Sequence, residues 1–337
     1  MTVTAAIIGA GGIGGAHSSA YQALPETRVT AVVDIRPEQA DKLAAIHGAK
    51  AYYSIEEFQR HEKPDMADVC VPSYLHPEVA IQCAGHGMHV LCEKPMAPDL
   101  GKAQTMVEAA RRNGVFLMIA QVIRFWSEYA YLKQVYDQGA YGRLIQAWFS
   151  RLSGAPIWSW ENWYLDPRRS GMAPFELHVH DTDFVHYMFG MPERVQSATA
   201  NVLAHHASYI RTRYFFAGQP ELLVESEGGW WQGPVPFEAT YRAIFEGAVL
   251  DYDGQKITVY EPGKEQPSIV DMAAGVSLGS AINLDNLGGI YNEIAYFTNC
   301  IRENRAPAVI TPEQSLDSLK LLLAELESAR LGRPLTL

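Results

Sequence analysis

A glycine-rich turn after the first predicted strand constrains the fold of this chain more than any other feature. The strand pattern covers residues 3–8 and leads directly into Gly9, Gly11 and Gly14, the spacing GxGxxG, before a helical pattern. Glycine here allows a tight strand-to-helix turn and a close approach of the backbone to a pyrophosphate. Asp34 ends the next strand pattern about 20 residues later, where a carboxylate can accept hydrogen bonds from ribose hydroxyls. Together these features predict a dinucleotide-binding βαβ unit.

Short β-branched runs alternate with helical segments up to about residue 120, which predicts a doubly wound parallel sheet. The strands expected there are 3–8, 28–33, 49–53, 67–71, 89–92 and 115–120. Longer alternating runs joined by short turns follow, which predicts an antiparallel sheet. Its expected strands are 144–152, 195–203, 209–216, 221–231, 237–246 and 249–253, and two helices are expected at 291–304 and 312–331. We therefore place a dinucleotide-binding domain at 1–120 and a second domain at 121–337.

Composition excludes several other classes of protein. There are 27 Lys and Arg against 38 Asp and Glu, a net charge of −11, so the clustered positive charge that binds nucleic acid is not expected. No apolar run approaches the roughly 20 residues that span a bilayer. The chain opens on a strand pattern without the features of a signal peptide, which predicts a cytoplasmic location. The 4 cysteines show no CxxC spacing, so no disulfide framework or zinc site is expected.

The acid at the end of the second strand also bears on the choice of cofactor. The negative charge of Asp34 would repel a 2′-phosphate, which favours NAD over NADP. Arg36 could lie on the adenine, reach a phosphate, or be a solvated residue of the turn. Gly12 and Ile13 complete the turn that would hold the pyrophosphate.

The residues after the fifth strand, Glu93-Lys94-Pro95, resemble a motif of the Gfo/Idh/MocA oxidoreductases. Three other segments are similar to motifs of that family: 72–76 to Pro-Asn-x-x-His, 121–125 to Asn-x-x-Arg-Phe, and 176–180 to Asp-x-x-x-His. The resemblance implies a Rossmann domain and a second α/β domain with an open, mostly antiparallel sheet. It also implies NAD(P), hydride transfer to or from a cyclic polyol or sugar, as in inositol dehydrogenase, and a homodimer or homotetramer through the open sheet.

Three residues are candidates for the chemistry. Lys94 follows a parallel strand, and ligands bind at the carboxyl edge of such sheets. Its amine could take or give the substrate's hydroxyl proton. Glu176 and His180 are four residues apart, which on a helix puts them on one face. The simpler alternatives are a surface lysine and a histidine satisfied in the core.

The turn and the resemblance together assign larger sets of residues. The expected cofactor-binding residues are Gly9, Gly11, Gly12, Ile13, Gly14, Asp34, Arg36, Pro72, Ser73, His76, Glu93, Lys94 and Gln121. The expected substrate-binding residues are Lys94, Arg124, Trp163, Arg168, Glu176 and His180. The histidine-rich segment 178–186 could be read as a metal cluster, but a spacing of two on a helix points side chains apart, so we expect no metal.

The sequence departs from the family pattern at three positions that bear on the substrate. Glu176 stands where aspartate is usual, Ser73 replaces an asparagine, and Met172 and Ala173 replace glycines. Two other functions are therefore kept. One is an NAD-using glycoside hydrolase that works by transient oxidation and elimination. The other is a non-catalytic NAD-sensing regulator, which would be expected to lack Lys94 or His180.

Overall fold

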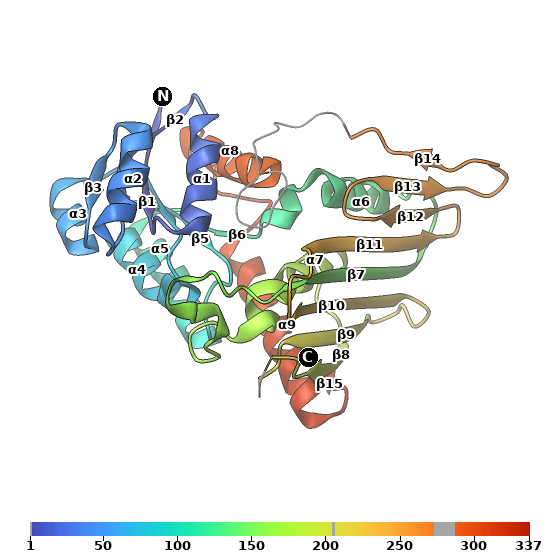
Figure 1. Cartoon of the computed structure of the whole chain (residues 1–337). Coiled ribbons are helices and arrows are strands. Elements are labelled where there is room, and N and C mark those ends of the chain that lie inside the picture. The colour runs from blue at the N-terminus through green and yellow to red at the C-terminus, as the bar shows by residue number, and fades with distance from the viewer. Residues whose placement is uncertain (1, 204–205, 273–286) are drawn as a thin grey trace. The chain divides into compact units, whose positions relative to one another are not determined.

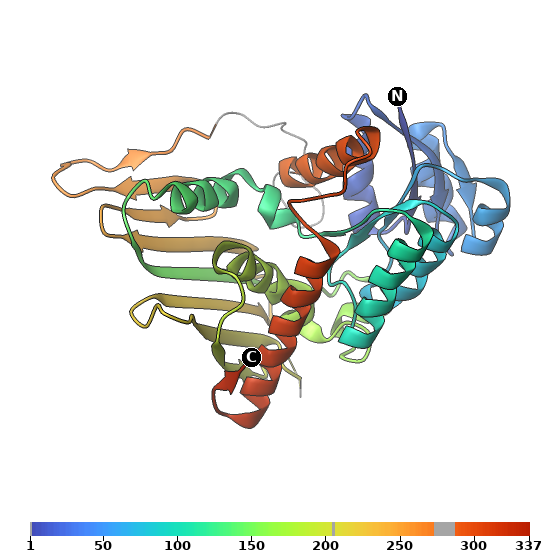
Figure 2. The same ribbon diagram turned by 180° about the vertical axis from the view of Figure 1, so that it is seen from behind.

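The computed structural model describes residues 2–203, 206–272 and 287–337. The chain divides into two compact units (Figures 1 and 2). The described residues of unit 1 are 2–125 and 287–316, and those of unit 2 are 126–203, 206–272 and 317–337. The predicted division after residue 120 differs from this one, because residues 287–316 belong to unit 1. No described helix has the length and apolar character needed to cross a membrane.

Unit 1 is built on a six-stranded sheet in which the paired strands are all parallel. Its order, β3-β2-β1-β4-β5-β6, is that of a doubly wound sheet with its switch point between β1 and β4. The predicted doubly wound sheet is confirmed. The strands are β1 (Val3–Ile8), β2 (Thr27–Val33), β3 (Lys50–Tyr52), β4 (Met66–Val69), β5 (His89–Glu93) and β6 (Leu117–Ala120).

Helices cover the sheet of unit 1 and begin at residues that suit a helix start. The Ser54 hydroxyl accepts the Glu57 amide at 3.1 Å, and Asp99 accepts the Lys102 amide at 2.8 Å. The helices are α1 (Gly12–Gln22), α2 (Pro37–His47), α3 (Ile55–His61), α4 (His76–Gly85), α5 (Leu100–Asn113) and α8 (Gly288–Arg302), with the 3₁₀ turns η1 (Ser73–Leu75) and η2 (Val122–Phe125). The helix α8 packs against α1 and β1, which explains why this late segment joins unit 1.

Unit 2 is built on a nine-stranded sheet in the order β14-β13-β12-β11-β7-β10-β9-β8-β15. Its strands are β7 (Leu144–Gly154), β8 (Arg194–Ala200), β9 (Tyr209–Phe215), β10 (Leu223–Trp231), β11 (Glu238–Phe245), β12 (Val249–Tyr252), β13 (Ile257–Tyr260), β14 (Ser268–Ile269) and β15 (Leu335–Thr336). All the described pairs are antiparallel except β7 with β10, which run parallel. The mostly antiparallel sheet is confirmed, and the parallel pair is a feature that alternation alone did not predict.

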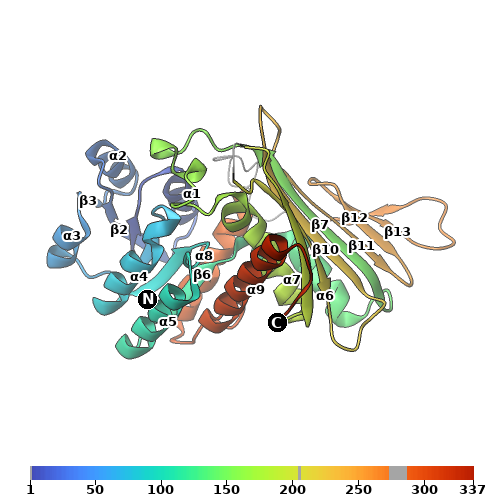
Figure 3. The ribbon, with the colours of Figure 1, turned by 90° about the horizontal axis from the view of Figure 1, so that it is seen from below.

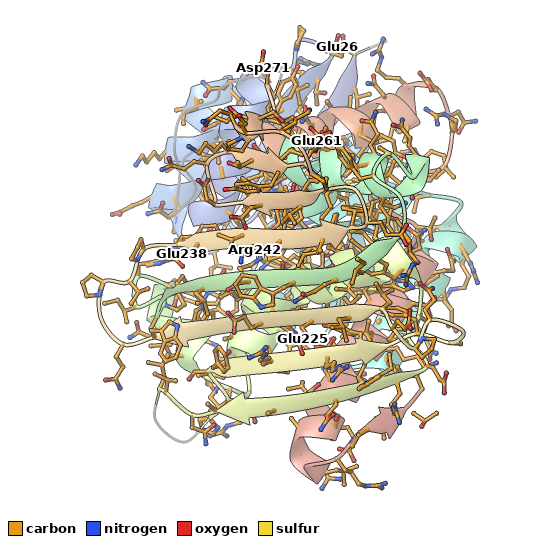
Figure 4. All side chains as sticks on the ribbon, turned by 90° about the vertical axis from the view of Figure 1, so that its right-hand side faces the viewer. Glu26, Glu225, Glu238, Arg242, Glu261 and Asp271 are labelled. Carbon is orange, nitrogen blue, oxygen red and sulfur yellow. The ribbon has the colours of Figure 1, made fainter. Side chains whose placement is uncertain are left out.

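The helices of unit 2 lie on one face of this sheet (Figure 3). They are α6 (Ser127–Gln138), α7 (Val179–Phe189) and α9 (Pro312–Leu331), which starts in unit 1. Unit 2 also contains the 3₁₀ turn η3 (Trp160–Leu165) and the π-helical turn η4 (Pro174–His178). A buried ion pair ties α7 to β7: Arg151 Nε donates to Asp181 Oδ2 at 2.9 Å, and Nη2 donates to the Tyr129 hydroxyl at 3.2 Å. Figure 4 looks onto the opposite, open face, where Glu225 and Arg242 are labelled.

Candidate active site

The glycine turn between β1 and α1 leaves room for a ligand. Gly9 has a φ of +105°, and a Cβ there would lie 2.6 Å from the Cys70 carbonyl oxygen, so packing within the chain requires this glycine. A Cβ on Gly11 would meet only Arg36 Nη2, at 3.7 Å, which is an ordinary contact. The chain itself therefore does not require glycine at position 11. The first turn of α1 has neither a side-chain cap nor an acidic residue, so its amides suit an anion such as a pyrophosphate.

Asp34, at the end of β2, fixes this turn through both carboxylate oxygens. Its Oδ2 accepts the Ala10 amide at 2.8 Å, and Oδ1 accepts Arg36 Nε at 3.0 Å. Arg36 Nη2 also donates to Oδ2, at 2.9 Å. Burial alone would raise the pKa of Asp34, but the hydrogen bonds from Arg36 and Ala10 lower it. The carboxylate is thus ionised and paired with Arg36, a pairing that the sequence did not reveal.

The ends of β4 and β6 place further predicted cofactor residues. Ser73 is buried in η1, and the His76 ring is buried with Nδ1 2.7 Å from the Pro95 carbonyl oxygen and Nε2 3.0 Å from that of Val71. Burial lowers the pKa of His76. These contacts position the turn that carries Lys94, and a direct contact of the ring with a cofactor stays a prediction. Gln121 Oε1 is buried without a hydrogen-bond partner in the described part of the chain, which fits a bound polar ligand.

Lys94 follows β5 and is half-buried, whereas the preceding Glu93 is buried. The Glu93 carboxylate accepts the Lys94 amide through Oε2 at 3.1 Å, and its Oε1 lies 3.1 Å from His17 Nε2. The other ring nitrogen of His17, Nδ1, lies 2.8 Å from Asp68 Oδ2. Glu93 therefore supports the lysine turn from within the core, and its predicted contact with a cofactor is untested.

Sequence reasoning missed His17 and Asp68. Asp68 is the one polar residue of β4, His17 lies among the buried residues of α1, and both are fully buried. Such a residue needs a partner, because burying an unpaired charge is costly. That expectation could have marked the two residues as a pair, but their positions give no sign that Glu93 joins them.

In unit 2, Glu176 and His180 lie on either side of a change of helix type. Glu176 is buried in the π-helical turn η4, and His180 is half-buried in α7. Because a π turn is wider than an α turn, the step from Glu176 to His180 is not that of a regular α-helix, and their sharing of one face stays a prediction. Gly171 and Met172, just before η4, have φ values of +73° and +66°. Such π turns are frequent at functional sites.

The turn η4 is held to its own unit by the residue between the two candidates. His178 Nε2 lies 2.9 Å from Glu325 Oε2 on α9, and the Tyr214 hydroxyl donates to Glu325 Oε1 at 2.8 Å. On the other side, a Cβ on Gly228 of β10 would lie 2.8 Å from His178 Cβ, so glycine is needed where the turn meets the sheet. The backbone between Glu176 and His180 is therefore fixed by the packing of His178.

Two of the other predicted substrate residues, Arg124 and Trp163, make structural contacts. Arg124 is buried, and its Nη1 donates to the Val309 carbonyl oxygen at 2.7 Å and to Gln314 Oε1 at 2.8 Å. Trp163 is buried and stacks on Tyr164 with ring centroids 4.0 Å apart. Arg168 is exposed. The contact of each with substrate remains a prediction.

The side chains of the histidine-rich segment go to different partners. Beyond His178 with Glu325 and Asp181 with Arg151, Asp183 accepts a hydrogen bond from Ser318 at 2.7 Å. Among the described residues, the donors close enough to share a metal ion are His17, Asp68 and Cys70, whose ligand atoms lie within 4.8 Å of one another. The His17 and Asp68 donors are already hydrogen-bonded to each other, so the geometry is that of an ion pair.

The order of the parallel sheet, the glycine turn at the start of α1 and the carboxylate that ends β2 define a dinucleotide-binding protein of the Rossmann class. Residues 3–121 match the sequence model described as "Oxidoreductase family, NAD-binding Rossmann fold". Residues 129–227 match the GFO/IDH/MocA C-terminal domain. The chain belongs to the Gfo/Idh/MocA family, and its cofactor is NAD.

Relatives of this chain differ in what they do. It is 28% identical over 202 residues to 2,7-anhydro-N-acetylneuraminate hydratase of Mediterraneibacter gnavus, covering 60% of this chain and 53% of that protein. It is 30% identical over 187 residues to glucose-6-phosphate 3-dehydrogenase of Bacillus subtilis, covering 54% of this chain and 53% of that protein. The chain thus spans about half the length of these relatives.

Similarity to solved structures extends over the whole chain. An oxidoreductase from Agrobacterium radiobacter in complex with NAD+, L-tartaric acid and magnesium superposes with a TM-score of 0.86 at 18% identity. The match covers 100% of this chain and 98% of that one. At this identity the match shows a shared fold.

Proposed function

We propose that this protein transfers hydride between NAD and a secondary alcohol of a sugar or cyclic polyol. The observation that carries the proposal is the Glu93-Lys94 turn at the carboxyl end of β5. Ligands of doubly wound sheets bind at this edge, near the switch point between β1 and β4. A half-buried lysine, whose backbone amide is held by a buried carboxylate, is suited to exchange a proton with a hydroxyl.

The residues of unit 1 fit the dinucleotide. The α1 amides and the space above Gly11 would take the pyrophosphate, Asp34 the adenosine ribose, and the buried Gln121 oxygen would accept a hydrogen bond. When bound, nicotinamide supplies the hydride acceptor or donor. The remaining chemistry belongs to side chains of the protein.

We assign the proton chemistry to Lys94 of unit 1, and name Glu176 and His180 as the candidates that unit 2 contributes. In the oxidation direction the substrate carbon loses a hydride and its hydroxyl loses a proton. The Lys94 amine would take that proton directly, or His180 would take it in its place. Glu176 would accept a hydrogen bond from a neighbouring hydroxyl and so fix the orientation of the ring that is oxidised.

The proposal is tested by following NADH absorbance with a panel of inositols, aldoses, sugar phosphates and sugar acids. We expect stoichiometric NAD reduction with at least one of them, and loss of this activity in Lys94→Met. If the protein binds NAD but reduces it with none of these compounds, the proposed dehydrogenase activity is overturned.

The similarity to a hydratase favours a second candidate, lyase or glycoside hydrolase chemistry by transient oxidation and elimination. The hydride removed in the first step would return to the substrate at the end, so NAD would be used without net turnover. Product formation from a glycoside or anhydro-sugar, without NADH accumulation, would favour this candidate over the dehydrogenase.

We further propose that the open face of the unit 2 sheet pairs with a second copy of the chain (Figure 4). The proposal is supported by Leu223 and Tyr260, exposed apolar residues on strands of this sheet, and by the charged pair of Arg211 with Glu225. Sedimentation equilibrium should show a dimer or tetramer that Leu223→Asp weakens. A monomer at micromolar concentration would contradict this proposal.

A further inference from the structure

A chain of buried polar side chains runs beneath the Lys94 turn of unit 1. It starts at Asp68 on β4, passes through both ring nitrogens of His17 on α1, and reaches the carboxylate of Glu93 on β5, with steps of 2.8 and 3.1 Å. The second oxygen of Glu93 then accepts the amide of Lys94. The helix that begins at the glycine turn is thereby connected to the lysine turn by hydrogen bonds.

The geometry requires a charged imidazole. Each ring nitrogen of His17 faces a carboxylate oxygen, and a neutral imidazole has only one N–H to donate. Burial by itself would lower the pKa of His17, but the Asp68 carboxylate outweighs it, and the pKa is raised well above its usual value. Burial would raise the pKa of Glu93, but bonding to His17 lowers it. One cation thus lies between two anions.

Three titratable groups around this cluster, Cys70, Tyr21 and His76, have pKa values shifted so that each is uncharged near neutral pH. Cys70 Sγ lies 3.6 Å from His17 Nδ1, and burial raises the pKa of this thiol. Burial and Asp68 raise the pKa of Tyr21, on the same helix. His76, near Glu93, has its pKa lowered by burial. The helix α8, which also packs against α1, carries the buried Glu293.

Two cations act on the one carboxylate of Glu93. The charges of both His17 and Lys94 help to lower the pKa of Glu93. The Glu93 charge thus attracts the Lys94 ammonium group, and the His17 charge opposes that attraction. Loss of His17 would leave an uncompensated negative charge behind Lys94, whereas loss of the Glu93 charge would leave the balanced pair of His17 and Asp68.

We propose that His17 is a positioning residue for Lys94, acting through Glu93. Its imidazolium takes up much of the Glu93 charge and holds that carboxylate against the Lys94 amide, which eases release of the proton from the Lys94 ammonium group. The inference rests on the proposed function in assigning the substrate's proton to Lys94.

Competitive labelling with acetic anhydride tests this without a substrate. The full-length protein is labelled across a range of pH, and mass spectrometry quantifies the acetylated Lys94 peptide against the exposed Lys42 as internal standard. In His17→Asn, we expect Lys94 to become reactive about half a pH unit or more higher than in the wild type. In Glu93→Gln, we expect the shift to be downward, because Gln removes the charge while its amide oxygen can still accept one of the two hydrogen bonds.

Opposite shifts of the Lys94 labelling pH in His17→Asn and Glu93→Gln distinguish this role from a purely structural one. Damage to the fold would move both variants in the same direction, and that result, or the absence of a shift, overturns the proposal. His47→Asn is the matched control, because His47 also bonds to α1, through Ser18 Oγ at 2.7 Å, and should leave Lys94 labelling unchanged.

If His17→Asn fails to fold, His17→Gln replaces it in the same comparison with Glu93→Gln. An upward shift in the pH at which Lys94 of Glu93→Gln becomes reactive is by itself enough to contradict the proposal. Labelling does not depend on turnover, so a failure of the dehydrogenase assignment shows only in the substrate panel. Once a substrate is found, the ascending limb of the kcat pH profile should move in the same two directions.

Discussion

At the scale of single residues, the pairing of Asp34 with Arg36 changes the expectation for cofactor choice. The aspartate still places a carboxylate where an NADP 2′-phosphate would lie, but it also holds the guanidinium that could bind such a phosphate. The selectivity for NAD that we expect thus rests on two effects, and one substitution removes both of them.

Asp34→Ser should therefore bring the dissociation constants of NADP and NAD closer by about tenfold or more, roughly 1.4 kcal/mol. The repulsion is lost and Arg36 is released to bind the 2′-phosphate. Titrations followed by nicotinamide fluorescence measure both constants. The control is Asp34→Ser with Arg36→Gln, in which most of the gain for NADP should disappear. A wild-type protein that prefers NADP would contradict the ribose assignment.

Lys94 and His180 should behave as a unit if both serve one substrate oxygen. Lys94→Met and His180→Asn should each lower kcat by about 10²- to 10⁴-fold, the usual effect of losing a positioned acid or base. The double variant should be less impaired than the product of the two effects. Steady-state kinetics on the best substrate of the panel gives these values, and NAD affinity serves as the control. A Lys94→Met protein with near wild-type turnover would remove Lys94 from the chemistry.

The sequence predicts some of these residues well and others not at all. Gly9, Gly14 and Asp34 follow from local rules, because turn geometry and a fixed spacing determine them. The partners of His17 come from β4 and β5, which are distant in sequence, so no local pattern reveals them.

At the scale of secondary structure elements, the segment before the π turn is the most constrained part of unit 2. A Cβ on Gly171 would lie 2.5 Å from the Phe175 ring, one residue before Glu176. Met172, also in the left-handed region, is buried in an apolar cluster with Ala173, Leu177 and Trp230. This arrangement was not predicted, since π turns lack a sequence signature.

Gly171→Ala should therefore displace η4 and Glu176. We expect the clash with Phe175 to lower the free energy of unfolding by on the order of 1–3 kcal/mol, in addition to the effect of backbone strain. We also expect turnover to fall. Gly139→Ala is the control, because Gly139 has a φ of +59° and no atom lies near its Cβ position. Its free energy of unfolding should therefore fall only by the backbone strain, about 1 kcal/mol. Urea unfolding followed by tryptophan fluorescence compares the two. Equal losses in both variants would show that Phe175 moves aside freely.

Element assignment from the sequence was accurate where periodicity is strong. The last helix, expected at 312–331, is observed as α9 (Pro312–Leu331). The parallel pairing of β7 with β10 and the short strands β13, β14 and β15 were not predicted. Strand partners are chosen by packing across the whole sheet, and alternation within one strand carries no information about direction.

At the scale of the whole molecule, the His17 cluster makes stability depend on pH in a defined direction. The folded-state pKa of His17 is raised, so its contribution is fully present below the usual histidine pKa of about 6.5 and is lost as pH rises through the folded value. The folded-state pKa values of Glu93 and Asp34 are lowered, so their contributions are lost as pH falls through those values. Unit 1 should be most stable between the two limits.

The free energy of unfolding of the wild type should therefore exceed that of His17→Asn most below pH 6.5, and the difference should shrink as pH rises. All 7 tryptophans lie in unit 2, so far-UV circular dichroism is the measurement that also follows unit 1. A difference that stays constant or grows towards alkaline pH would contradict the charged state assigned to His17.

The discontinuity of unit 1 has a consequence for synthesis on the ribosome. The helix α8, which packs against α1 and β1, is made after nearly all of unit 2. The first 125 residues therefore emerge without the helix that covers one side of α1, and the Thr27 hydroxyl lacks its partner on Thr298 until then. The nascent nucleotide-binding unit thus exposes apolar surface through most of translation, a period in which a chaperone could bind it.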